Sequence, residues 1–480
     1  MKRMHGRRPF EASIDSIASL AVVSLLLASC VSTSSGPAPT TVPPPAVVGV
    51  QAKQLQPGYW IARDSGASKT VLDRKDIAAQ NARLVQVDPT VHDLEKLPST
   101  LAADEVRSWI GKMSEYPDEE LFDADGRKIE RSTLDALVHN LALDTLPATQ
   151  ATRHGLIVKR ADLRTFPGAQ RAYRGDDGHI DGDIDRFQES ALFPGTPVVI
   201  AHESRDGAWC FVVSPLYSAW VEKRFIAEGP RDQVFAYVHK TPYLVVTGAT
   251  ARTVFTPSRP QVSELQLDMG VRVPVLADWP PGEPVNGQSP YTSHVIELPE
   301  RADDGSLRFT PALLPRTADT ADDYLPLSRA NLLRQGFKFL GERYGWGHSY
   351  NARDCSGFVS EVYRSFGVQL PRNTRDQAVT TAIDRITFTK DDDHERRLAV
   401  LRNLSVGDLV YIPGHVMMVI GHDKGMPYII HDVTGVSYRD GSGDVKRVVL
   451  NGVSVTPLTP LLLSRGPLVD QITSILRVRP

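Results

Sequence analysis

The chain has 480 residues, of which 41% are apolar and 23% are charged, and its formal net charge at pH 7 is −3. The absence of a basic excess argues against a nucleic-acid-binding protein, and no long block of like charge indicates a solvated tail. The length is sufficient for about three domains.

The N-terminus predicts an export signal. The basic stretch MKRMHGRRPF precedes the apolar run IASLAVVSLLLASC, which is shorter than the ~20 residues that a membrane span needs. The run ends in Leu27-Ala28-Ser29-Cys30, which resembles the lipobox of bacterial lipoproteins. That resemblance implies that residues 1–30 are a lipoprotein signal peptide and that Cys30 becomes lipidated; the alternative is a plain signal peptide cut nearby. Val31 rather than Asp after Cys30 implies a periplasmic protein that is anchored to the outer membrane.

Composition divides the remainder of the chain. Residues 31–54 are rich in Ser, Thr and Pro and predict an extended, disordered tether. Residues 55–151 predict a helical N-terminal domain. Short β-branched and aromatic runs, broken by Gly, Pro and Asp, then predict two small β-barrels over 152–235 and 236–318. Cys210 lies in the apolar run AWCFVVS and is expected to be a buried structural residue.

The final segment, residues 319–480, has helical patterns first and strand patterns after, which describes an α+β unit. Its stretch RDCSGFVSEVYRSFG contains Cys355. Apolar residues follow at the spacing of one helical face, at Val359, Val362, Tyr363 and Phe366. Cys355 is therefore expected in the first helical turn, where the helix dipole favours a nucleophilic thiolate. A small buried cysteine would fit the same pattern.

A cysteine nucleophile needs a base, and that base needs an orienting partner. His415 begins the strand-like run HVMMVIG, and His422 lies about 23 Å away if that strand is extended. At most one of these two can therefore contact Cys355. His431 ends the next run, YIIHD, and would reach His415 if the two strands pair antiparallel. Each histidine could equally be satisfied separately in the core or on the surface.

Three stretches together resemble the NlpC family of papain-like bacterial cell-wall cysteine peptidases: YGWGHSYNARDCSGFVSEVYRSFGVQLPRNTRDQ, VGDLVYIPGHVMMVIG and YIIHD. The resemblance implies that Cys355 is the nucleophile, His415 the general base and His431 the residue that orients the base. It also implies that Tyr344 forms the oxyanion site together with the backbone N–H of Cys355. Two neighbours of the nucleophile would line the substrate pocket, namely Asp354 and Ser356.

Two positions depart from the family pattern. His348 stands where the family usually has glycine, and we expect it at the rim of the cleft. Asn373 stands where relatives that act on free stem peptides tend to carry Asp, a carboxylate that resembles a clamp for the substrate amine. Recognition of that amine would then be weaker or shared with other residues.

The whole arrangement resembles a subgroup of this family with a lipoprotein signal, a helical N-terminal domain, two bacterial SH3-like barrels and a papain-like peptidase domain. In that subgroup the first barrel closes one end of the cleft. Glu189 and Tyr217 are the residues that the resemblance nominates at this wall. The alternative interpretation is that Glu189 is a solvated loop carboxylate and Tyr217 an aromatic residue on the barrel surface.

The resemblance implies a monomeric, cofactor-free cysteine endopeptidase anchored in the envelope. It would hydrolyse the γ-D-glutamyl–meso-diaminopimelate bond of peptidoglycan stem peptides with free N-terminal L-Ala, in cell-wall turnover or recycling. The alternatives are a non-catalytic wall-binding lipoprotein and an amidase or acyltransferase on the same scaffold. A metal site built from Cys355, His415, His431 and Asp354 would lack the short ligand spacings of structural zinc sites.

Overall fold

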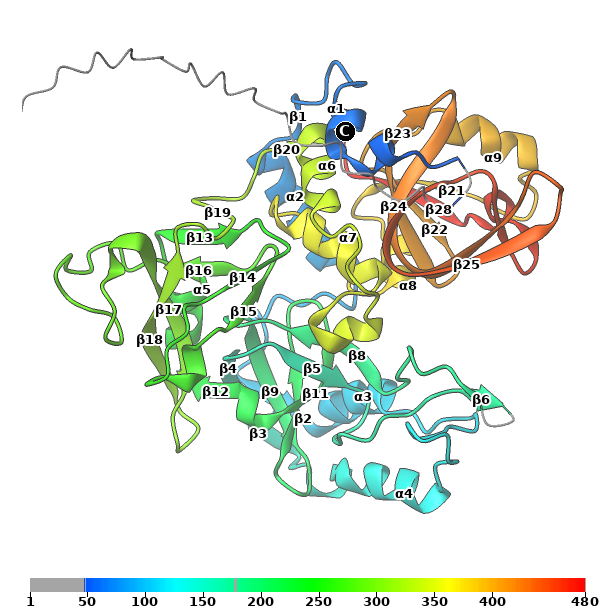
Figure 1. Cartoon of the computed structure of the whole chain (residues 1–480). Helices are drawn as coiled ribbons and strands as arrows, with labels where there is room; N and C mark the ends of the chain where they lie inside the picture. The colour runs from blue at the N-terminus through cyan, green and yellow to red at the C-terminus, as the bar shows by residue number, and fades with distance from the viewer. Residues whose placement is uncertain (1–46, 48, 177–178, 480) are drawn as a thin grey trace, which may run out of the picture. The chain divides into compact units, whose positions relative to one another are not determined.

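The computed structural model describes residues 47, 49–176 and 179–479 (Figure 1). The chain separates into two units, Met1–Pro43 and Pro44–Pro480, and the description concerns the second. The expected signal peptide and Cys30 lie outside the described residues. Within the described part of the chain, no helix is long and apolar enough to cross a membrane.

The helices expected over residues 55–151 form, but they do not share one core. Their bounds are α1 Pro57–Ile61, α2 Arg74–Val87, α3 Ala103–Met113 and α4 Arg131–Asn140. Trp60 and Leu84 from the first two helices are buried in the core of the C-terminal domain. Val106 and Ile110 from α3 are buried against strands of the first barrel. The helices of residues 55–151 therefore contribute to two hydrophobic cores, that of the C-terminal domain and that of the first barrel, and form no separate core.

The first barrel is a seven-stranded antiparallel sheet in the order β12-β4-β9-β10-β11-β5-β8. The strands are β4 Arg153–Ile157, β5 Ala161–Arg164, β8 Gln188–Leu192, β9 Pro197–Glu203, β10 Trp209–Val213, β11 Ser218–Glu222 and β12 Ile226–Gly229. Side chains alternate between the two faces of β10, so that Cys210 faces one core and Phe211 the other. Cys210 is a free, buried cysteine, as the sequence predicts, and burial raises its pKa to about 12.

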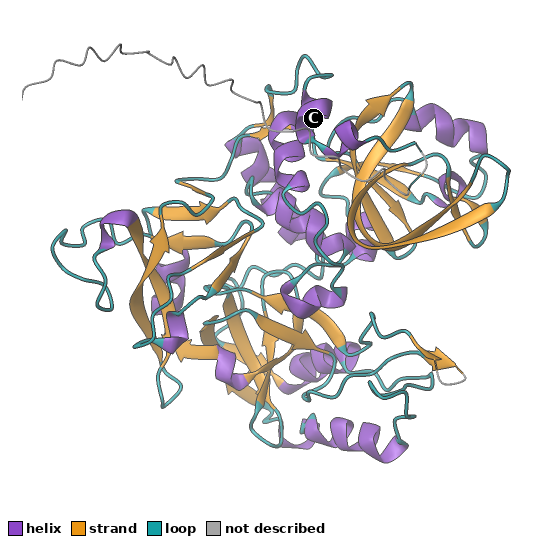
Figure 2. Ribbon diagram, in the orientation of Figure 1, coloured by secondary structure: helices purple, strands orange, loops and turns teal. Residues whose placement is uncertain are grey.

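The second barrel follows α5, Arg231–Val238, so the expected boundary at residues 235/236 falls inside a helix. Its strands are β13 Tyr243–Val246, β14 Thr250–Arg252, β15 Gln266–Asp268, β16 Arg272–Pro274, β17 Ser293–Arg301, β18 Leu307–Pro315 and β19 Thr320–Ala321. They enclose a separate core that includes Val246, Leu267 and Leu314. Figure 2 shows the strands of both barrels as distinct groups, separate from the C-terminal sheet.

The C-terminal domain places its helices before its main strands, as the sequence predicts. Its helices are α6 Arg329–Phe337, α7 Cys355–Arg364, α8 Thr374–Val379 and α9 His394–Leu401. The main strands are β22 Leu409–Ile412, β23 His415–Asp423, β24 Met426–Arg439, β25 Val445–Pro457, β26 Leu461–Leu463 and β28 Ser474–Arg477. The sheet order is β21-β28-β22-β23-β24-β26-β27, with β21 at Asp384–Thr387, β27 at Gly466–Pro467 and β25 paired to β24.

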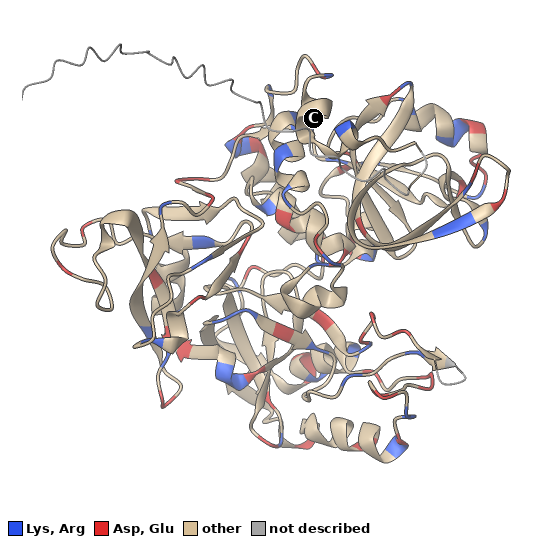
Figure 3. Ribbon diagram, in the orientation of Figure 1, with Lys and Arg blue, Asp and Glu red and all other residues tan. Residues whose placement is uncertain are grey.

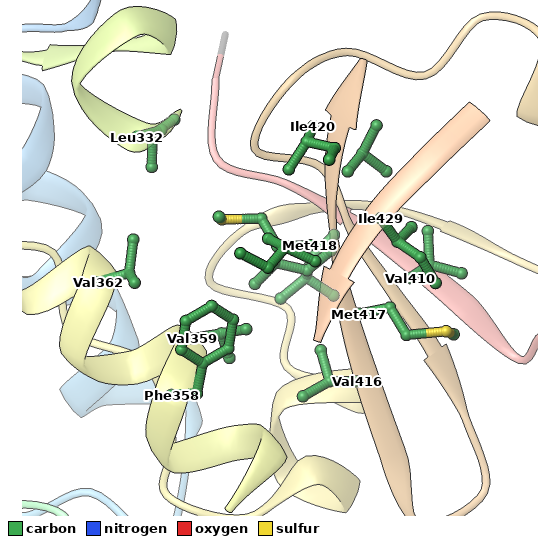
Figure 4. Packing of buried hydrophobic residues seen from close by; sticks show 14 of the residues in the cluster. Leu332, Phe358, Val359, Val362, Val410, Val416, Met417, Met418, Ile420 and Ile429 are labelled. Atoms are coloured by element: carbon green, nitrogen blue, oxygen red, sulfur yellow. The ribbon is translucent and has the colours of Figure 1, made fainter. Parts of the chain in front are cut away.

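Helix α7 packs directly against β23 and β24. Phe358, Val359 and Val362 point from the helix toward Val416 and Met418 of the sheet (Figure 4). All five side chains are fully buried, and each contributes roughly 1.5–3 kcal/mol relative to an exposed position. This packing fixes the start of α7, and with it Cys355, beside the start of β23.

Candidate active site

Cys355 is the first residue of α7, and its side chain is only 5% exposed. Asp354 caps the helix, because its Oδ1 accepts a hydrogen bond from the backbone N–H of Gly357 at 2.7 Å. The Cys355 Sγ lies 3.6 Å from Oγ1 of Thr374 and 4.0 Å from the carbonyl oxygen of Gly414. The thiol is thus held between the helix start and the residue that precedes His415.

The thiol does not have the low pKa that its place at the helix start predicts. Burial and the nearby Asp354 carboxylate raise the pKa of Cys355 to about 12, against the smaller lowering effect of Thr374 and the Val416 backbone. Burial also lowers the pKa of His415 to about 4. Burial therefore favours the neutral thiol of Cys355 and the neutral imidazole of His415.

The two histidines form the first link of a hydrogen-bond chain. Nε2 of His415 lies 2.9 Å from Nδ1 of His431, and Nε2 of His431 lies 3.1 Å from Oγ1 of Thr456. The antiparallel pairing of β23 with β24 brings the histidines together, as the sequence predicts. If His415 takes the thiol proton on Nδ1, its Nε2–H donates to His431, and the Nε2–H of His431 donates to Thr456.

Thr456 is a site residue that the sequence did not reveal. It lies on β25, whose long antiparallel ladder with β24 places it behind His431. Its side chain is fully buried. Burial and the nearby His415 keep the pKa of His431 well below its usual range, so His431 remains neutral. No spacing in the sequence marks this threonine, because only the register of the two strands makes it a partner.

Tyr344 borders the same space as the histidines. Its side chain is 8% exposed, and burial, together with the neighbouring Cys355 and Asp354, raises the pKa of its phenol. The phenol therefore remains an O–H donor near neutral pH. The backbone N–H of Cys355 belongs to the first turn of α7, where amide groups have no partner within the helix. These are the two donors that the family resemblance implies for an oxyanion.

Asp354 and Ser356 are held by Arg372, a buried arginine that no pattern in the sequence marks as a site residue. Nη2 of Arg372 donates to Asp354 at 2.8 Å, and Nη1 donates to Ser356 at 2.9 Å. Burial alone would raise the pKa of Asp354, but the Arg372 guanidinium outweighs it, and the pKa falls to about 2. Nε of Arg372 donates to Ser190 of β8 at 2.6 Å. The first barrel thus contacts the residues that flank the nucleophile.

The expectation that His348 lies at the cleft rim is wrong. Its side chain is only 3% exposed. Nδ1 accepts from Arg372 at 2.9 Å, and Nε2 lies 3.2 Å from Glu361. A Cβ on Gly357 would lie 2.5 Å from the ring, so the absence of a side chain there makes room for it. The His348 ring therefore packs against the first turn of α7. There it links two charged side chains, Arg372 and Glu361, by hydrogen bonds.

A second charge cluster joins the domains beside the nucleophile. Arg353, which is fully buried, donates to Asp268 of the second barrel at 2.7 Å and to Glu361 of α7 at 2.9 Å. Arg160 of the first barrel donates to the carbonyl oxygen of Ala352 at 2.7 Å. The two residues that precede Asp354 are therefore anchored from both barrels.

Glu189 and Tyr217, nominated from the first barrel, are in direct contact. The Tyr217 hydroxyl donates to Oε2 of Glu189 at 2.5 Å, and Thr165 donates to Oε1 at 2.7 Å. Burial and the Glu189 carboxylate raise the pKa of Tyr217 well above its usual value, against a smaller lowering effect of Asn373, the residue that precedes α8. The structure thus brings the three nominated residues together at the junction of barrel and C-terminal domain.

The fold and the site define a papain-like domain that is combined with bacterial SH3-like barrels. Residues 341–450 match the NlpC/P60 family, and residues 177–222 match the SH3 domain of the SH3b1 type. The chain therefore contains an NlpC/P60 domain in its C-terminal part and an SH3 domain within its first barrel.

Two relatives support this assignment. A γ-D-glutamyl-L-lysine dipeptidyl-peptidase of Bacillus cereus is 29% identical over 219 residues, which are 45% of this chain and 52% of the relative. The chain thus matches about half the length of that curated protein. A solved NlpC/P60 endopeptidase from Photobacterium damselae subsp. piscicida is 17% identical, with a TM-score of 0.68 over 86% of this chain and 94% of the other. That similarity extends the shared fold across the barrels as well as the C-terminal domain.

Proposed function

We propose that this protein is a cysteine endopeptidase that hydrolyses the γ-D-glutamyl–meso-diaminopimelate bond of peptidoglycan stem peptides. The observation that carries the proposal is the hydrogen-bond chain from His415 through His431 to Thr456, which begins at the residue after Gly414, a contact of the Cys355 thiol. A non-catalytic wall-binding protein would have no need of this arrangement. The activity in the name of the Bacillus cereus relative, on a γ-D-glutamyl-L-lysine bond, supports the same class of substrate.

In the proposed reaction, His415 accepts the Cys355 proton as Sγ attacks the glutamyl γ-carbonyl carbon. Burial favours the neutral thiol and the neutral imidazole, and in this proposal the proton moves as Sγ attacks. The Tyr344 hydroxyl and the Cys355 backbone N–H stabilise the oxyanion. Collapse of the tetrahedral intermediate breaks the amide bond, and His415 returns its proton to the leaving amine. Water then hydrolyses the thioester.

The free amine of N-terminal L-Ala would be recognised at the wall of the first barrel. Asn373 carries no charge, whereas Glu189 supplies a carboxylate that Tyr217 and Thr165 hold in place. We propose that Glu189 provides the negative charge that an aspartate at position 373 would otherwise provide. Because Glu189 would bind the free amine of L-Ala, the enzyme would cleave short free peptides. It would not cleave stem peptides of intact wall, in which this amine is substituted.

The test is mass spectrometry of L-Ala-γ-D-Glu-meso-diaminopimelate after incubation with the protein from residue 31 onward, beside Cys355→Ala. Release of L-Ala-γ-D-Glu and diaminopimelate by the wild type alone is the expected result. Absence of cleavage would favour the wall-binding alternative. Cleavage of an N-acetylated peptide at the same rate would contradict the assigned role of Glu189 while leaving the peptidase assignment intact.

We also propose that the protein is anchored in the envelope through a lipid on Cys30. The lipobox-like Leu27-Ala28-Ser29-Cys30 after an apolar run supports this proposal. Expression in a Gram-negative host should yield a membrane-fraction protein, whose N-terminal peptide carries a diacylglyceryl cysteine by mass spectrometry. Cys30→Ala should lack that modification. A wild-type N-terminus without lipid would refute the anchor.

A further inference from the structure

A cavity of about 220 Å³ lies where both barrels meet the C-terminal domain. Its walls come from the turn between β8 and β9, the end of α5, the segment that leads into β16, and two residues of the C-terminal domain, Tyr324 and Arg364. None of the residues assigned to catalysis or to the substrate lines it. Arg364 ends α7, whose first residue is Cys355, so about 14 Å of helix separates this cavity from the nucleophile.

Two arginines line the cavity without a carboxylate beside them. They are Arg272 and Arg364, and among the described residues of the wall none is Asp or Glu. Within the described structure Arg272 forms no ion pair, and its Nη1 and Nη2 donate to backbone carbonyl oxygens at and just beyond the end of α5. Arg364 donates from Nε and Nη2 to the carbonyl oxygen of Met269, and its ion pair with Glu361 is long, at 3.8 Å. Burial lowers the pKa of Arg364, so the surrounding carboxylates do not fully compensate its charge.

Tyr324 adds a hydroxyl group to the same wall. Within the described structure this hydroxyl has no hydrogen-bond partner. Burial raises the pKa of Tyr324, against a smaller lowering effect of Arg272 and Arg364, so the hydroxyl keeps its proton near neutral pH. The cavity therefore combines two guanidinium groups with a hydroxyl that is able to donate a hydrogen bond.

The rest of the wall is apolar and closely fitted. The guanidinium carbon of Arg364 lies 4.4 Å from the centroid of the Phe193 ring, and Phe193 also lines the cavity. Gly270 has a φ of +80°, and a Cβ there would lie 2.6 Å from Cγ of Arg364. Gly195 has a φ of +82°, and its Cβ would lie 3.0 Å from the Tyr237 ring. Two glycines thus give these side chains the space they occupy at the wall.

We propose that this cavity binds a small organic carboxylate, whose charged end meets Arg272, Arg364 and the Tyr324 hydroxyl while its apolar body lies against Phe193. Guanidinium groups bind carboxylates through charge-assisted hydrogen bonds. A cationic ligand would add a third positive charge, and a neutral one would leave both guanidinium groups without an anion. Because Arg272 belongs to the second barrel and Arg364 to α7, the ligand would join the two domains and stabilise the folded chain.

Phenylacetate is a probe of this class, and phenylacetamide, which has the same shape without the charge, is its matched control. In a ligand-observed NMR titration of the protein from residue 31 onward, we expect a dissociation constant for phenylacetate about tenfold lower than that for phenylacetamide. Cys355→Ala should bind phenylacetate as the wild type does, because the cavity is separate from the active site. Equal affinity for the two compounds, or no binding of phenylacetate, would overturn the proposal.

Variants of the wall locate the bound probe. Arg272→Gln removes one charge and should weaken phenylacetate binding by about tenfold. Arg252→Gln removes a charge from β14 of the same barrel, outside the cavity, and should keep the wild-type affinity. Tyr324→Phe removes only the hydroxyl that has no partner, so it should leave the fold intact and weaken binding by about threefold. Wild-type affinity in both Arg272→Gln and Tyr324→Phe would place the probe elsewhere and refute the site.

Discussion

His431 is joined to Thr456 by a hydrogen bond of 3.1 Å, on the side of the ring opposite to its contact with His415. Thr456 therefore holds the His431 ring from one side while His415 contacts it from the other. In the proposed reaction Thr456 would thus be a positioning residue that acts through His431 on His415.

Replacement of Thr456 by valine removes the hydroxyl partner of His431 with little change in volume. We expect kcat to fall by about tenfold with KM nearly unchanged, because the His431 ring loses a hydrogen bond and Thr456 does not line the cavity beside His415. Thr456→Ser should restore most of the activity. Steady-state kinetics on the tripeptide measure both variants, and a kcat for Thr456→Val equal to that of the wild type would contradict the positioning role.

The protonation state of the resting nucleophile can be measured by alkylation. Because the pKa of Cys355 is raised to about 12, iodoacetamide should react slowly at pH 7 and faster as the pH rises above 9. A Cys210→Ala background removes the other free cysteine of the described chain. A rate that already reaches its plateau near pH 6 would instead reveal a thiolate–imidazolium pair in the resting enzyme.

Asp432 gives a prediction for stability. Its side chain is fully buried, and within the described structure neither carboxyl oxygen has a hydrogen-bond partner. Burial, with smaller contributions from Asp354 and Glu342, raises the pKa of Asp432 to about 9. Between pH 4 and 9 the unfolded chain releases this proton and the folded chain keeps it, so the residue destabilises the fold increasingly as pH rises.

Asp432→Asn should remove that penalty. We expect the free energy of unfolding to increase by roughly 2–4 kcal/mol at pH 8 and to change little at pH 4, where the unfolded chain still holds about half of this proton. Urea titrations at the two pH values measure the difference. An equal effect at both pH values would assign the change to packing rather than to ionisation.

Glu189→Gln tests the proposed recognition of the substrate amine. The variant removes the charge and keeps one accepted hydrogen bond, while its amide N–H can donate to the oxygen of the other hydroxyl. We expect KM for the free tripeptide to rise by about tenfold and the discrimination against its N-acetylated form to shrink. Thr165→Val, which loosens the carboxylate without removing its charge, should have a smaller effect. A KM unchanged by Glu189→Gln would place amine recognition elsewhere.

The sequence predicted those site features that depend on local pattern. Helical periodicity placed Cys355 at a helix start, and two consecutive strands brought His415 to His431. The pattern could not predict Thr456, whose role depends on strand register. It also misplaced His348, because burial beneath α7 is decided by distant neighbours.

Charge was harder to predict than position. The helix dipole suggested a thiolate, yet burial around Cys355 outweighs it. The same limit applies to the N-terminal helices, whose pattern shows that they form but not which core receives them. In the described chain, acidic and basic residues are interspersed throughout (Figure 3), so composition alone does not single out the few that are buried in pairs.

Arg353, Arg160 and Arg372 tie the segment around the nucleophile to both barrels. A C-terminal domain separated from its barrels would expose the Arg353 guanidinium and would lose the Ser190 support of Arg372. The barrels are therefore integral to the enzyme and not interchangeable targeting modules. Exchange of these barrels for unrelated wall-binding domains would remove the contacts that hold the segment around Cys355, so an engineered version would have to keep the three domains together.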